Sequence, residues 1–119
     1  TPIDKKAILE AYYVALVVGD LDRVLQFGTP DSVIHYGDET KSFQEMMRFH
    51  FEGSENRKEE HVIEDTVSEG DRLEVRLTSY YYPDSEPAWK MQYIAIIRLE
   101  EDRMAEFWHC MRTKIEIKD

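Results

Sequence analysis

The sequence lacks the residue patterns that build the common metal and cofactor sites. Its 119 residues include one cysteine, Cys110, which excludes a disulfide within the chain. The histidines fit no zinc-binding spacing, and neither a glycine-rich phosphate loop nor a Gly-x-Ser-x-Gly turn is present. We therefore expect no metal and no cofactor. Because Cys110 stands in a run typical of a strand, we expect its side chain to be a small buried hydrophobic group.

Basic residues are also scarce, and they are scattered among acidic ones. Lysine and arginine number 15 against 25 aspartates and glutamates, which gives a formal net charge of -10. Binding to nucleic acid or to an anionic membrane requires clustered positive charge, so we expect neither partner.

Long hydrophobic runs are missing as well. The longest candidate, Ala11 to Val18, is broken by Gly19 and Asp20 and falls short of the roughly 20 residues that span a bilayer. The N-terminus has no basic region followed by an apolar stretch, so no secretory signal is expected. With a single cysteine, these features predict a soluble, cytoplasmic protein.

The sequence does contain enough apolar material for one packed core. Hydrophobic residues make up 42% of the chain and aromatic residues 12%. A chain of this length and composition predicts a single domain over residues 1–119.

Three helices are predicted, all in the first half of the chain. Apolar residues recur every three or four positions over residues 3–18, where Gly19 ends the pattern, and Asp20 can cap a short second helix over 21–27. Ser42 and Glu45 form a capping box for a third helix that reaches about residue 52. The apolar face of this third helix carries one histidine, His50.

The second half of the chain predicts strands. After a short strand over 32–36, alternation with a period of two runs through residues 57–69, 72–77, 91–99 and 104–117. In the first of these long strands, His61, Ile63, Asp65 and Val67 are expected on one face. Consecutive hairpins of this kind predict an α+β fold in which helices pack on one face of a curved antiparallel sheet.

The order of these motifs resembles the SnoaL-like and ketosteroid-isomerase-like families of the nuclear-transport-factor-2-like superfamily. The resemblance rests on Tyr12 with the Gly-Asp-Leu-Asp run at 19–22, the Pro-Asp-Ser-Val turn at 30–33, the hairpin around Glu69-Gly70-Asp71, and the segments 97–99 and 104–108. It implies a cone-shaped, cystatin-like α+β roll with a deep pocket between the curved sheet and the helices. It also implies a homodimer formed through the sheet face.

The catalytic residues of these families match this sequence only in part. Tyr12 falls where the steroid isomerases keep an oxyanion-hole tyrosine, whereas Tyr36 and Ala95 fall where they keep two aspartates. Arg112 stands at the position of the acidic residue of SnoaL-like cyclases. Neither acid/base scheme is therefore complete in this chain.

His50 is the leading candidate for a catalytic base, because it lies on the apolar side of the third helix. A contact with Asp65 would fix its tautomer and raise its basicity, and Tyr12 or Tyr36 would act as hydrogen-bond donor. The alternative is a half-buried histidine that bonds to one backbone group or carboxylate. For Asp65 the alternative is a solvated side chain or a pair with Arg76.

Five further residues are candidates for contact with a ligand. They are Tyr36, His61, Tyr93, Trp108 and His109, whose rings and polar groups suit a pocket for a small organic molecule. Core packing would explain most of them equally well. Trp108 and His109 are adjacent on one strand, so only one of the two can face inward.

Two functions remain open. The first is a pocket protein that binds a small, largely apolar organic molecule and catalyses acid/base isomerisation, cyclisation or hydration without a cofactor. The second is a non-catalytic ligand-binding or dimerisation module, in which Tyr36, Phe49 and Trp108 close the pocket. A cavity of about 300 Å³ or more, faced by His50 and a carboxylate, would favour the first.

Overall fold

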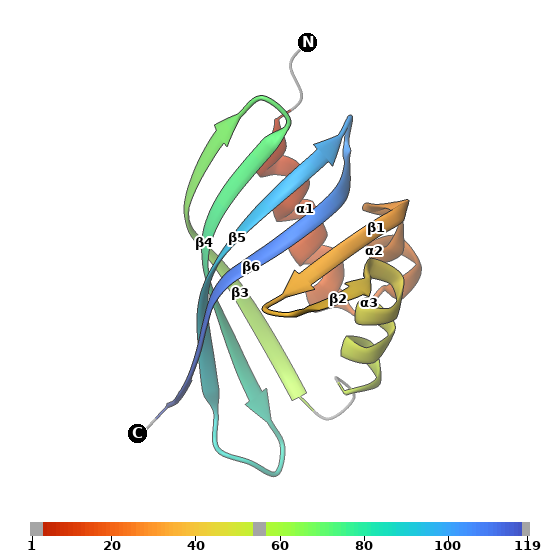
Figure 1. Cartoon of the computed structure of the whole chain (residues 1–119). Helices are drawn as coiled ribbons and strands as arrows, with labels where there is room; N and C mark the ends of the chain where they lie inside the picture. The colour runs from red at the N-terminus through yellow and green to blue at the C-terminus, as the bar shows by residue number, and fades with distance from the viewer. Residues whose placement is uncertain (1–3, 54–56, 118–119) are drawn as a thin grey trace.

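The computed structural model describes residues 4–53 and 57–117, except for the side chains of residues 111–113. Figure 1 shows a curved, open sheet that bends around α1, with α3 beside β1 and β2. In chain order the elements are α1 (Lys5–Val18), α2 (Leu21–Gln26), β1 (Gly28–Tyr36), β2 (Glu39–Ser42), α3 (Phe43–Glu52), β3 (Arg57–Glu69), β4 (Arg72–Pro83), β5 (Trp89–Glu100) and β6 (Arg103–Glu116). The predicted α+β class is confirmed.

The helix ends follow local sequence signals. The carboxylates of Asp4 and Asp20 accept hydrogen bonds from backbone amides of α1 and α2, and the Ser42 hydroxyl accepts one from the amide of Glu45. Gly19 ends α1 at a φ of 86°, a left-handed conformation that glycine adopts without steric cost. These caps fix where α3 begins and hence where His50 lies.

The sheet has six strands in the order β2-β1-β6-β5-β4-β3. Four of its pairings are antiparallel, but β1 pairs with β6 in parallel, which the hairpin pattern does not predict. β1 begins at Gly28 rather than near Ser32, and β2 was not expected. All four residues of β2 are exposed, so this edge strand has no apolar alternation to reveal it.

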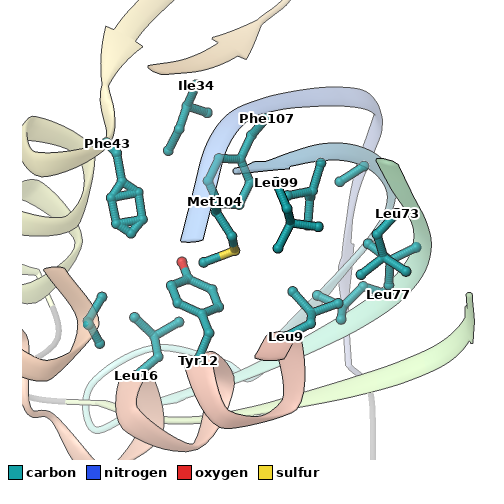
Figure 2. Packing of buried hydrophobic residues seen from close by; sticks show 14 of the residues in the cluster. Leu9, Tyr12, Leu16, Ile34, Phe43, Leu73, Leu77, Leu99, Met104 and Phe107 are labelled. Atoms are coloured by element: carbon teal, nitrogen blue, oxygen red, sulfur yellow. The ribbon is translucent and has the colours of Figure 1, made fainter. Parts of the chain in front are cut away.

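The hydrophobic core lies between α1 and the concave face of the sheet. Figure 2 shows Tyr12 and Leu16 of α1 turned toward Met104 and Phe107 of β6, with Phe43 of α3 beside them. These five side chains are all at most 8% exposed. The core thus joins α1 and α3 to the sheet and leaves the far end of the concave face for other side chains.

A bulge in β3 changes which residues face the core. Ile63 pairs with Leu77 but Asp65 pairs with Arg76, so the register shifts at Glu64. His61 and Ile63 point inward, as predicted, whereas Asp65 is exposed and Val67 is 58% exposed. The prediction that all four share one face is wrong, because the bulge reverses the alternation after Ile63.

A second bulge, in β6, determines the positions of three neighbouring side chains. Ala95 pairs with His109 and Ile94 with Met111, so Cys110 lies between the two pairs. Its side chain is exposed, which contradicts the expected burial. His109 faces inward and Trp108 lies on the outer face. Among the described residues, no helix is long and apolar enough to cross a membrane.

Candidate functional site

A hollow of about 670 Å³ opens between α3 and the far end of the sheet's concave face. Tyr36 of β1, His50 of α3, Arg57 of β3 and residues of β4, β5 and β6 line it. Much of the remaining lining is aromatic or sulfur-containing, from Met46, Met47, Tyr81, Trp89, Met91 and Tyr93. Such a surface suits a small organic molecule with an apolar or aromatic body.

His50 and Glu59 form a close pair at this hollow. Nε2 of His50 lies 3.0 and 3.1 Å from the two carboxylate oxygens of Glu59. The side chain of His50 is 20% exposed, whereas that of Glu59 is 6% exposed. A carboxylate only accepts hydrogen bonds, so Nε2 carries the proton and Nδ1 carries the basic lone pair.

His61 holds the same carboxylate from the other side. Its Nε2 lies 3.3 Å from a Glu59 oxygen, and its Nδ1 lies 2.7 Å from the hydroxyl of Ser79. The His61 side chain is 2% exposed, and its ring stacks on Tyr13 with a centroid distance of 4.7 Å. Nε2 therefore donates to Glu59, and the Ser79 hydroxyl donates to Nδ1. This second histidine orients the carboxylate that orients His50.

These contacts decide the charge of Glu59. Burial alone would raise the pKa of this carboxyl group, because the charged form loses hydration. The hydrogen bonds from His50 and His61 outweigh burial and lower the pKa from 4.5 to about 2. Glu59 is therefore ionised at neutral pH, in the form that accepts hydrogen bonds from both histidines.

Tyrosine hydroxyls extend the polar network. The hydroxyls of Tyr13 and Tyr93 lie 3.2 Å apart, and Tyr93 also lines the hollow. Burial raises the pKa of Tyr93 to about 12, although hydrogen bonds with Tyr13 and Ser79 oppose this rise. The Tyr93 hydroxyl thus stays protonated at neutral pH and can serve as a hydrogen-bond donor. The ring of His109 stacks on both Tyr36, at 4.4 Å, and Tyr93, at 5.3 Å.

Four of the eight predicted site residues line the hollow, and the other four do not. His50, Tyr36, Tyr93 and His109 line the hollow, while His61 lies behind Glu59. Trp108 lies on the outer sheet face, where it stacks on His35 at 5.5 Å. Its side chain is therefore on the opposite side of β6 from the hollow.

Tyr12 is placed in the core rather than on the wall of the hollow. Its hydroxyl lies 3.3 Å from Sδ of Met47, and its side chain is buried among apolar residues (Figure 2). Burial raises the pKa of Tyr12 well above its usual value, so its hydroxyl is neutral. Met47 stands between this hydroxyl and the hollow, because Met47 lines the hollow and Tyr12 does not.

The expected contact between His50 and Asp65 is not formed. Asp65 lies beyond the β3 bulge and is exposed, and Glu59 takes its place beside His50. Glu59 was not among the residues predicted from the sequence, although the signal for it is present. The period-two pattern that places His61 inward also places Glu59 inward, two residues earlier on the same strand.

The hollow also bears on the two functions left open by the sequence. Its volume of about 670 Å³ is above the threshold of about 300 Å³ that would favour the first function. Of the three rings expected to close it, Phe49 is 74% exposed and Trp108 lies on the outer face. Among the described residues, no group of three or more His, Cys, Asp or Glu side chains is placed to hold a metal ion.

Comparison with known proteins gives one match to a family and many to solved structures. The model of the SnoaL-like domain family matches residues 9–107. No curated protein sequence matches the chain.

The similar structures include an epoxide hydrolase, an epoxide hydrolase/cyclase-like enzyme and a designed binder. A Mycobacterium tuberculosis epoxide hydrolase of the LEH-like type has a TM-score of 0.74 at 14% identity, covering 87% of this chain and 78% of that one. The epoxide hydrolase/cyclase-like enzyme SalBIII of salinomycin formation has a TM-score of 0.71 at 16% identity, covering 88% of each. A computationally designed binder of 17-OHP has a TM-score of 0.72 at 12% identity, covering 87% and 90%.

Proposed function

Because the chain belongs to the family of SnoaL-like domains, we propose that it binds a small, largely apolar organic molecule in the hollow under α3 and moves a proton on it without a cofactor. The observation that carries this proposal is the pair of His50 and Glu59. A histidine that lines an aromatic hollow and is hydrogen-bonded through one ring nitrogen to a buried carboxylate has the arrangement of a general base.

Each group has a separate role in the proposed reaction. Nδ1 of His50 takes a proton from the bound molecule and later returns it to another position. Glu59 holds the imidazole in the required tautomer and stabilises the imidazolium that forms. The hydroxyl of Tyr93 donates a hydrogen bond to the bound molecule. Isomerisation and cyclisation fit this sequence of proton transfers. In hydration, Nδ1 would instead take the proton from a water molecule whose oxygen adds to the bound molecule, and would return that proton to the bound molecule.

The structural neighbours support this range of reactions without selecting one. Two of them are named as an epoxide hydrolase and as an epoxide hydrolase/cyclase-like enzyme, and both share the fold at 16% identity or less. Likeness at this level concerns the fold alone, and function depends on the groups in each site.

A second candidate function is a non-catalytic binding module. The designed 17-OHP binder favours it, because that protein uses the same fold to hold a small molecule. The proposed homodimer through the sheet face suits either function. On the outer face, Ile94 and Tyr82 are 37% and 43% exposed, and both would gain from burial against a second copy. The cytoplasm is the proposed compartment for both.

The first experiment asks whether the purified protein carries a molecule. Native mass spectrometry of protein isolated under mild conditions should detect a bound small molecule, which denaturation releases. A variant that fills the hollow, Met91→Trp, should lack it. Retention of the same molecule by this variant would show that the hollow is not its site.

The second experiment tests the base. The probe 5-nitrobenzisoxazole opens its ring in one step when a base removes its carbon-bound proton, so product absorbance reports the base directly. The protein should accelerate this reaction, and His50→Gln should lose roughly 100-fold of the acceleration, the lower end of what a positioned base contributes. His35→Gln is the matched control, because His35 also bonds to a glutamate but lies on the outer face. Equal rates for the two variants would refute the role of His50.

A further inference from the structure

Arg57 has a buried donor with no acceptor. Its Nε is inaccessible to solvent and has no hydrogen-bond partner within the described structure. The carboxylate of Glu59 is 3.7 Å away, which is close enough for an ion pair but too far for a hydrogen bond. Because Nε faces Glu59 and is shielded from solvent, a ligand oxygen in the hollow could reach the guanidinium only at its terminal nitrogens.

The guanidinium is held in place on several sides. Its central carbon lies 5.0 Å from the ring centroid of Tyr81, a cation–π contact, and the Arg57 side chain is 21% exposed. A methyl group added at Gly53 would lie 3.8 Å from Nη1, so the end of α3 approaches from another direction. An arginine packed in this way loses little further freedom when it binds an acceptor.

Arg57 also lies next to the proposed base. The same oxygen of Glu59, Oε2, is 3.1 Å from Nε2 of His50 and 3.7 Å from Nε of Arg57. Both side chains line the hollow. The imidazole and the guanidinium therefore meet at the same carboxylate, and both residues border the space that a bound molecule would fill.

Other charged groups at the hollow are less suited to bind an anionic group of a ligand. Lys41 lines the hollow from the edge strand β2, but it is exposed, as are Glu39 and Glu52. Solvent screens charges at such positions strongly. The negative charge of Glu59 is shared among two histidines and Arg57, so the guanidinium keeps hydrogen-bonding capacity for a further acceptor.

We propose that Arg57 binds an anionic oxygen of the molecule held in the hollow. This inference rests on the proposed function and names the class of ligand, an apolar or aromatic body that carries a carboxylate, or a phenolate or enolate oxygen. A carboxylate is charged before binding. A phenolate or enolate acquires its charge when His50 Nδ1 removes the proton, and Arg57 then stabilises the oxyanion. The two sources share one requirement, a negatively charged oxygen beside His50.

Two pairs of probes separate these sources. In the first arm, 2-naphthoate is compared with the neutral 2-naphthamide by calorimetric titration at pH 7. In the second arm, 4-nitrophenol is titrated with pH in the presence of protein, and its absorbance reports the fraction of phenolate. The wild-type protein should bind naphthoate about tenfold more tightly than naphthamide, or should lower the apparent pKa of nitrophenol by about one, as a charge-assisted hydrogen bond would.

Arg57→Gln should abolish the preference for the anion and leave the neutral probes unaffected. Arg57→Lys keeps the charge without the forked terminal nitrogens of the guanidinium and should retain only part of the preference. Lys58→Gln is the matched control, because it removes a neighbouring positive charge on an exposed position of β3. Circular dichroism establishes that each variant is folded.

The outcomes distinguish this inference from the proposed function. An anion preference in either arm that Arg57→Gln removes supports the inference and identifies the source of the charge. If the neutral probes bind as tightly as the anionic ones, the role of Arg57 is overturned but the proposed function is not. If Lys58→Gln loses as much of the anion preference as Arg57→Gln does, the role of Arg57 is also overturned, since a general surface potential would then be responsible. If no probe binds, the inference and the proposed ligand site fail together.

Discussion

Replacement of Glu59 by glutamine should remove a large part of the acid dependence of folding. The substitution keeps the shape of the side chain but removes the charge that accepts hydrogen bonds from His50 and His61. In the folded protein, these bonds lower the pKa of Glu59 to about 2, against 4.5 for the free group. Protonation of Glu59 is therefore coupled to unfolding.

The size and sign of the effect follow from this difference in pKa. At about 1.4 kcal/mol per pH unit, a lowering from 4.5 to about 2 corresponds to at most roughly 3.5 kcal/mol of stability, which solvent screening reduces to about 2 to 3 kcal/mol. A carboxyl group with a lowered pKa stabilises the folded state fully above pH 4.5. That contribution is lost as the pH falls from 4.5 through about 2. Glu59→Gln should lack it at all pH values.

The assay is urea denaturation, followed by circular dichroism, at a series of pH values from 2.5 to 7. The free energy of unfolding of the wild type should exceed that of Glu59→Gln by about 2 to 3 kcal/mol near neutral pH, and the two should converge toward pH 2.5. Glu60→Gln is the control, because Glu60 is the exposed neighbour on β3. A constant difference between wild type and Glu59→Gln across this range would show that the pKa of Glu59 is not lowered by folding, and an equal effect of Glu60→Gln would show that the effect is not specific to Glu59.

Three other substitutions test the placement of particular side chains. Gly28→Ala should destabilise the fold by about 1–3 kcal/mol in urea titrations, because the new methyl carbon would lie 2.8 Å from the ring of Phe43. Tyr12→Phe should leave the rate with 5-nitrobenzisoxazole nearly unchanged, whereas Tyr93→Phe should reduce it; the reverse order would contradict the placement of Tyr12 behind Met47. Asp65→Asn should change stability by less than about 0.5 kcal/mol and leave that rate unaltered, since Asp65 is exposed beyond the bulge.

Features set by neighbouring residues could be predicted from the sequence. Asp20 and Ser42 cap helices through bonds to amides three residues away, and Gly19 ends α1 through its own backbone conformation. Such signals require no knowledge of the tertiary structure. Together with the alternation in the second half of the chain, they sufficed for the α+β class and for the position of His50 on α3.

Features that depend on pairing between strands could not be predicted in this way. The bulge at Glu64 arises from the register of β3 against β4, and it moves Asp65 from the expected inner face to solvent. The bulge at Cys110 likewise arises between β5 and β6. A period-two pattern carries no information on where an extra residue interrupts it. A carboxylate partner for His50 was therefore predicted correctly, but it was assigned to Asp65 instead of Glu59.

Glu59 holds His50 with its proton on Nε2, which leaves the basic lone pair on Nδ1. Nitrogen-15 NMR of the imidazole groups at neutral pH measures this directly, with His50→Gln used to assign the signal. Neutral His50 should be predominantly the Nε2–H tautomer in the wild type, and Glu59→Gln should weaken this preference while Glu60→Gln should not. A predominantly Nδ1–H tautomer, or a tautomer unaffected by loss of the Glu59 charge, would show that Glu59 does not orient His50.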